Sequence, residues 1–127
     1  MAKKISSTLS SDVSVKLDGT NYDLRVSLKA ATAISRQFGG MNNAFSALGR
    51  ADLDTYTFII KTGLAPEAQR ELSENDVDVA DVVWRAGMDN LAEPLSRYVS
   101  LLRNGGRDPE AIVADEEEKE KNDGLHV

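Results

Sequence analysis

The sequence predicts a mainly helical α+β protein, in which an N-terminal β-hairpin precedes a small bundle of four to five helices and a flexible acidic tail. Three observations support this fold class. Apolar and polar residues alternate over residues 13–28, which is the period of a half-buried strand. Beyond residue 28, apolar residues recur every three or four positions, as on amphipathic helices. Residues 105–127 carry a net charge of −5, whereas residues 1–104 carry −1.

We expect a single domain over residues 13–104, between a flexible leader at 1–12 and a mostly disordered or transiently helical tail at 105–127. The leader has two lysines but no apolar run, so it does not resemble a signal peptide. No segment approaches the roughly 20 apolar residues of a membrane span. The chain has no cysteine, which excludes a disulfide framework and favours an intracellular location.

The predicted hairpin turns within Asp18-Gly19-Thr20-Asn21, a stretch rich in turn-forming residues. Two registers remain open, because each leaves apolar residues opposite one another. A turn at Gly19-Thr20 would pair Leu17 with Tyr22, Val15 with Leu24 and Val13 with Val26. A turn at Asp18-Gly19 is the alternative. The outer edges of a lone hairpin are expected to be unpaired, and an unpaired edge favours association with another chain.

Three helices are predicted between residues 28 and 64. The first follows Ser27 and stops at Gly39-Gly40, the second ends at Gly49, and Asp52 caps the third. Their expected stripes are Leu28, Ala31, Ile34 or Ser35, and Phe38 in the first, Met41, Phe45 and Leu48 in the second, and Leu53, Tyr56, Ile60 and Leu64 in the third.

The segment "LSENDV" predicts the start of a fourth helix. Ser73 would be its N-cap and Asp76 its third residue, and Leu72 and Val77 would form a hydrophobic staple. The helix would end near Gly87. We expect its apolar side chains, including Val83 and Trp84, to join the core.

A last helix is predicted over residues 88–102, where apolar residues follow helical spacing closely. Pro94 either kinks this helix or marks the first turn of a new one. Gly105-Gly106 would end the folded body.

The residues of this chain do not predict an enzyme. The single histidine, His126, lies in the acidic tail, where nothing would hold it against a substrate. The acidic run lacks the ligand spacing of a calcium loop, and the glycine pairs lack the spacing of a phosphate loop. Asp78 and Asp81 share the solvent face of their helix. We therefore expect no catalytic, cofactor-binding or metal-binding residues, and the sequence does not identify the partner-binding ones. No cluster of Lys and Arg predicts nucleic-acid binding.

The order of these segments resembles a known family. "VKLDGTNYDLRVSL" runs directly into "KAATAISRQFGG", and "IIKTGL", "LSENDVDVADVVWRAG" and "LAEPLSRYVSLL" follow. This order over residues 13–103 resembles the tail assembly chaperones of long-tailed phages and gene transfer agents. The polar leader and the acidic tail depart from that pattern.

The resemblance implies a non-catalytic protein of the host cytoplasm that binds the tape measure protein and keeps it soluble while the tail tube assembles. It also implies contact with the tail tube protein and absence from the mature virion, while the unpaired hairpin edge predicts association with a second copy of the chain. A structural virion protein, such as a tail completion or head-tail connector subunit, is the main alternative, although such subunits usually contain larger sheets. A small binding module of a bacterial host is a third.

The acidic tail is expected to be dispensable for folding and to keep an assembly soluble through its charge. Its one apolar cluster is Ala111-Ile112-Val113-Ala114. Alternatively, Ile112 and Val113 dock on the folded body or on a neighbouring subunit.

Overall fold

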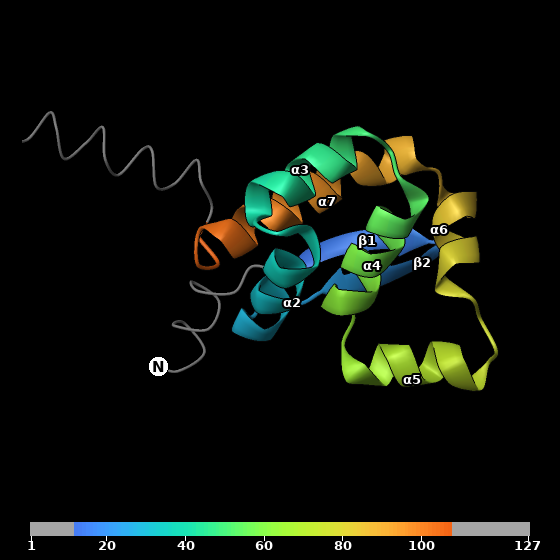
Figure 1. Cartoon of the computed structure of the whole chain (residues 1–127). Helices are drawn as coiled ribbons and strands as arrows, with labels where there is room; N and C mark the ends of the chain where they lie inside the picture. The colour runs from blue at the N-terminus through green and yellow to red at the C-terminus, as the bar shows by residue number, and fades with distance from the viewer. Residues whose placement is uncertain (1–11, 108–127) are drawn as a thin grey trace, which may run out of the picture.

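The computed structural model describes residues 12–107, which form a two-stranded antiparallel hairpin followed by helices (Figure 1). The predicted fold class is confirmed. Within this described part there are six helices, because a helix that the sequence did not indicate lies between the third and fourth predicted ones. The elements are β1 (Val13–Leu17), β2 (Thr20–Leu24), α2 (Leu28–Phe38), α3 (Met41–Gly49), α4 (Leu53–Gly63), α5 (Pro66–Glu74), α6 (Val79–Ala86) and α7 (Met88–Arg103). The leader up to residue 11 and the tail from residue 108 lie outside the described residues.

The hairpin turns at Asp18-Gly19, the second of the two registers. Val13 pairs with Leu24, Val15 with Tyr22 and Leu17 with Thr20. Asp18 and Gly19 have φ values of 53° and 81°, as in a type I′ turn, whose twist matches that of the strands. The Gly19-Thr20 register, with Val13 opposite Val26, is therefore wrong.

The helices cover the apolar side of the hairpin. In Figure 1, α4 crosses in front of the strands, α2 and α6 lie at opposite ends of the hairpin, and α3 runs along α7 at the top. β1 packs against both α6 and α7. α5 stands apart from the other helices in this view and is joined to the end of α4 by Gln69, whose side-chain amide donates to the carbonyl oxygens of Lys61 and Leu64.

One hydrophobic core joins the hairpin to all six described helices. The largest side chains buried in it are Tyr56, Tyr98, Leu17, Leu24, Ile34, Ile59, Ile60, Leu91, Leu95 and Leu101. Leu28, which the sequence placed on the inner stripe of the first helix, is instead 83% exposed. α2 packs through Ala30 and Ile34, and Leu28 points to the opposite side of the helix.

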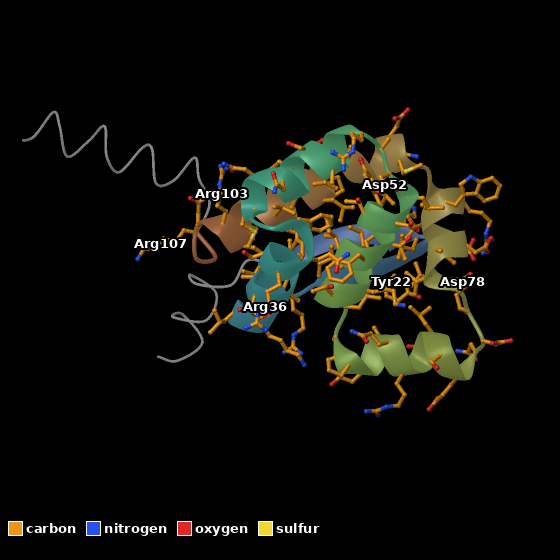
Figure 2. The ribbon with its side chains drawn as sticks, in the orientation of Figure 1. Tyr22, Arg36, Asp52, Asp78, Arg103 and Arg107 are labelled. Carbon is orange, nitrogen blue, oxygen red and sulfur yellow. The ribbon has the colours of Figure 1, made fainter. Side chains whose placement is uncertain are left out.

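The predicted start of the fourth helix is wrong. Ser73 lies inside α5, and the next helix begins at Val79 with Asp78 as its N-cap. The Asp78 carboxylate accepts a hydrogen bond from the Ala80 backbone N–H at 3.0 Å. Figure 2 shows Asp78 at the base of α6. Leu72 and Val77 therefore cannot form the predicted staple, because the helix starts five residues later than that staple requires.

Replacing Asp78 with alanine should lower the free energy of unfolding by about 1 kcal/mol, since the first turn of α6 loses its cap. Ser73→Ala is the matched control. It places a strong helix former inside α5, so its effect should stay within about 0.5 kcal/mol. Urea titrations followed by circular dichroism would measure both. A larger loss for Ser73→Ala than for Asp78→Ala would contradict this assignment of the cap.

Trp84 is not a core residue, contrary to the prediction, and 64% of it is exposed. α6 buries Val82 and Val83, and Val79 and Ala86 lie on the same side of the helix. Because successive residues are separated by about 100° around a helix, Trp84 falls on the opposite side. Val83 and Leu72 are buried as predicted, whereas Val77 is half-buried.

Trp84→Ala should consequently change the free energy of unfolding by no more than about 0.5 kcal/mol, as for most surface substitutions. Val83→Ala, one position away and fully buried, should cost about 1–3 kcal/mol. Chemical denaturation of the two variants checks this contrast. Equal losses in both would mean that the indole is packed in solution.

α7 is a single helix that contains Pro94, so the proline does not start a new helix. Its buried residues are Leu91, Leu95, Tyr98, Val99, Leu101 and Leu102. After Arg103 the chain turns through Gly105 and Gly106, and the Gly106 N–H donates to the Leu101 carbonyl at 2.7 Å. α7 thus ends just before Gly105-Gly106, and the residues after 107 lie outside the described part of the chain. None of the helices between residues 12 and 107 has both the length and the apolar character needed to cross a bilayer.

Candidate functional site

A solvent-open groove of about 900 Å³ lies where the first half of α2 faces one side of α4. The residues of α4 that line it are Asp54, Thr57, Phe58, Lys61 and Thr62, together with its last residue, Gly63. They follow one another at helical spacing, so a single face of α4 forms one wall. The junction between β2 and α2 and the start of α5 close the other sides.

The groove floor is apolar. Phe58 is half-buried and meets the Phe38 ring edge-to-face, with ring centroids 5.9 Å apart. This contact spans the two helices and fixes the Phe58 ring, since edge-to-face pairs are a favoured aromatic geometry. The other apolar lining residues are Val26, Ala30, Ala33, Leu64 and Pro66.

Charged side chains stand on the rim. Arg25, Lys29 and Lys61 are exposed cations, and Asp12 and Asp54 are exposed carboxylates. Asp12 accepts a hydrogen bond from the Val26 N–H at 3.3 Å and so closes the turn from the hairpin into α2. The rim as a whole carries one net positive charge.

A close contact between α4, α7 and the end of the hairpin holds Arg25 in place at the edge of the groove. The Arg25 N–H donates to the Gly63 carbonyl at 2.8 Å, and the Tyr98 hydroxyl donates to the Arg25 carbonyl at 2.7 Å. Gly63 permits this approach because a Cβ there would lie 2.9 Å from the Tyr98 hydroxyl oxygen. Both backbone groups of Arg25 are thus bonded, while its side chain remains exposed.

Burial raises the pKa of Tyr98 above its usual value near 10, and the negative charge of Asp12 adds to the increase. Above about pH 10 the unfolded state loses this proton while the folded state keeps it, so the stabilisation present below pH 10 is lost as pH rises. Tyr98→Phe should therefore show a shallower loss of stability between about pH 10 and 12. Tyr56, whose pKa burial also raises, contributes equally in both proteins. Parallel stability curves in alkaline urea titrations would contradict this assignment.

The acidic residues that the sequence drew attention to have structural roles. Asp78 caps α6, and Asp81 pairs with Arg85 at 3.0 Å on the same helix. Arg85 also pairs with Asp18 in the hairpin turn at 3.3 Å. Among residues 12–107 no group of three or more His, Cys, Asp or Glu side chains is arranged to hold a metal ion. His126 lies outside the described residues.

The hairpin edge is less open than the sequence suggested. The end of β2 is joined to the end of α4 by an antiparallel bridge between Leu24 and Leu64, next to the Arg25–Gly63 hydrogen bond. The groove itself was missed by sequence reasoning, because its lining comes from separate segments. The one sequence signal was the spacing of Phe58 and Lys61, which are three residues apart. This spacing places an aromatic and a cationic side chain on the same face of a helix.

The chain matches no family model, no curated protein and no solved structure in comparisons with known proteins.

Proposed function

We propose that this protein is a non-catalytic tail assembly chaperone of a long-tailed phage or gene transfer agent. It binds the tape measure protein in the host cytoplasm, keeps it soluble while tail tube subunits polymerise, and is left out of the mature virion. The resemblance that suggests this role rests on a hairpin running directly into a series of helices. Residues 13–103 have this order of elements, which supports the proposal.

The observation that carries the proposal is the groove between α2 and α4. Its α4 wall runs from Asp54 to Thr62, a rise of about 12 Å at 1.5 Å per residue. That length matches roughly two turns of a second helix, which would insert apolar residues at helical spacing above Phe58. A long, helix-rich tape measure protein presents many such segments. The tail tube protein and a second copy of this chain are further candidate partners.

Co-expression with the tape measure protein encoded by the same genome tests the proposal. The tape measure protein should move from the insoluble to the soluble fraction and co-purify with this chain. Ala33→Arg, which places a long side chain in the groove, should reduce the co-purified amount at least about tenfold, a loss of about 1.4 kcal/mol in binding. Gln37→Arg adds the same side chain to an exposed position of α2 outside the groove and should bind normally. An insoluble tape measure protein in the presence of the unaltered chain would contradict the proposal.

Mass spectrometry of purified particles separates this function from its main alternative. A chaperone should be absent from particles, whereas a tail completion or head-tail connector subunit should be present in a fixed ratio to the tail proteins. Detection at such a ratio would replace the proposed function with a structural one.

A further inference from the structure

The charges of the groove between α2 and α4 are arranged along its length. Lys61 lies near the end of α4, and the Arg25 backbone is bonded to Gly63 at that same end. α2 begins immediately afterwards, which brings Lys29 to this end as well. Asp54 lies at the opposite end, seven residues or about 10 Å along α4 from Lys61. The groove thus has a cationic end, defined by Arg25, Lys29 and Lys61, and an apolar middle around Phe58.

The three cations of this end make no ion pair with any residue in the described part of the chain. Asp12 also lines the groove, and its carboxylate accepts a hydrogen bond from the Val26 backbone N–H. By contrast, Arg85 pairs with two carboxylates, and Arg103 lies over the Phe45 ring at 4.8 Å and bonds the Asn42 side chain. The cationic end is therefore suited to an anionic ligand.

The sequence after residue 107 has complementary chemistry in a matching order. Residues 108–127 contain eight acidic and two basic side chains. Within them, the apolar cluster at residues 111–114 comes first, and four consecutive carboxylates at residues 115–118 follow. A segment that enters the groove from the end of α2 meets the apolar middle first and the cationic end last. The tail has its apolar and acidic residues in this same order.

We propose that residues 111–118 of this chain bind in the groove between α2 and α4. Ile112 and Val113 cover the apolar floor near Phe58, and the carboxylates of residues 115–118 face the cationic end. This is the docking alternative that the sequence left open, now assigned to one surface.

The point where the described chain ends makes this contact geometrically accessible. The Arg103 side chain donates a hydrogen bond to the Asn42 side chain, so the end of α7 lies beside the start of α3. Only two residues separate the start of α3 from the end of α2. In Figure 2, Arg107 lies on the same side of the view as Arg36 of α2. The groove begins at Ala33, about one and a half helical turns from the end of α2. Ile112 is five residues beyond Arg107, and five extended residues reach up to about 16–18 Å, which exceeds the roughly 7–8 Å along α2 from its end to Ala33.

The chain's own segment is favoured over a separate ligand by its effective concentration. A short covalent connection holds a segment near its site at an effective concentration of the order of millimolar. A weak contact is then occupied without any partner, and a partner helix must displace it. This contact forms within the free chain, so it is tested without the tape measure protein. A negative result would therefore leave the proposed chaperone function unaffected.

Paramagnetic broadening in the full chain tests the proposal. Because the chain has no cysteine, the Asn122→Cys variant carries a nitroxide at a single site just after the acidic run. In ¹⁵N-labelled protein, the amide signals of Arg25, Lys29 and Lys61 should lose most of their intensity relative to the reduced label. Signals from α6, at the far end of the molecule from α2 in Figure 1, should keep theirs. Added salt should restore the lost intensity, since contacts between exposed charges are screened.

Charge reversal provides the matched control. Lys29→Glu combined with Lys61→Glu should abolish the broadening at Arg25. Lys16→Glu combined with Arg50→Glu changes the net charge equally at exposed positions outside the groove and should leave it intact. Absence of broadening in the groove would overturn the proposal, as would its loss in the control variant. Broadening that requires mixing spin-labelled with ¹⁵N-labelled chains would also overturn it, because the occupant would then be the tail of a second copy.

Discussion

Replacing Tyr98 with alanine should lower the free energy of unfolding by about 3–5 kcal/mol, the range for truncation of a large buried aromatic residue. Tyr98 is fully buried, and it lies where α7, the end of β2 and the end of α4 meet. Its removal leaves a cavity at this junction and takes the donor away from the Arg25 carbonyl. Urea unfolding followed by circular dichroism gives the loss directly.

Tyr98→Phe separates the two contributions to this loss. It keeps the ring and removes only the hydroxyl, so it should cost about 1 kcal/mol, the usual net worth of one hydrogen bond. If Tyr98→Ala were no more destabilising than Tyr98→Phe, the ring would not be packed as the structure shows.

Gly63→Ala should destabilise the protein by about 1–3 kcal/mol, the typical cost of adding a methyl group to a filled core. An added Cβ would lie 2.9 Å from the Tyr98 hydroxyl oxygen and 3.0 Å from the Leu24 Cβ. Both neighbours are themselves buried, so relief requires a shift of α4 relative to the hairpin or to α7. The midpoint of thermal or urea unfolding measures the effect.

Gly49→Ala is a matched control with the opposite expected sign. Gly49 lies at the end of α3, and nothing stands within 4 Å of an added Cβ. Alanine there should stabilise the helix by up to about 1 kcal/mol, because glycine loses more backbone entropy on folding. If both variants changed stability in the same direction by similar amounts, backbone entropy rather than crowding would dominate at Gly63.

The order and type of most elements were predictable because their side chains follow simple periods. Alternation identified both strands, and Gly39 and Asp52 identified the end of α2 and the start of α4. The hairpin register was ambiguous because both turns kept apolar residues opposite one another. The choice depended on backbone geometry, since Asp18 and Gly19 both adopt the left-handed conformation that a type I′ turn requires.

The segment from residue 65 to 79 was the least predictable, and the reasons are physical. α5 buries only Leu72, so no apolar stripe revealed it. Ser73 and Asp78 are both residue types that cap helices, and the local sequence does not show which one precedes a helix facing the core. α6 begins only at Val79, so Val77 is not part of it, and its buried face is centred on Val82 and Val83 with Trp84 on the other side.

The groove could not be predicted in the same way, because no single segment contains it. Phe58 and Lys61 come from α4, Lys29 from α2 and Arg25 from the chain between β2 and α2. They are brought together by the Arg25–Gly63 and Tyr98–Arg25 hydrogen bonds. Such contacts join residues far apart in the chain and leave no periodic signal.

The hydrogen bond from Tyr98 to Arg25 also has a consequence for synthesis on the ribosome. Its two residues are separated by 73 positions, which take roughly 4–15 s to translate at 5–20 residues per second. An isolated hairpin is at best marginally stable. During this interval the apolar face of β1 and β2 therefore lacks its contacts with α7. Nascent chains that end before residue 98 should therefore remain sensitive to protease, and protection should appear only once α7 has left the ribosome.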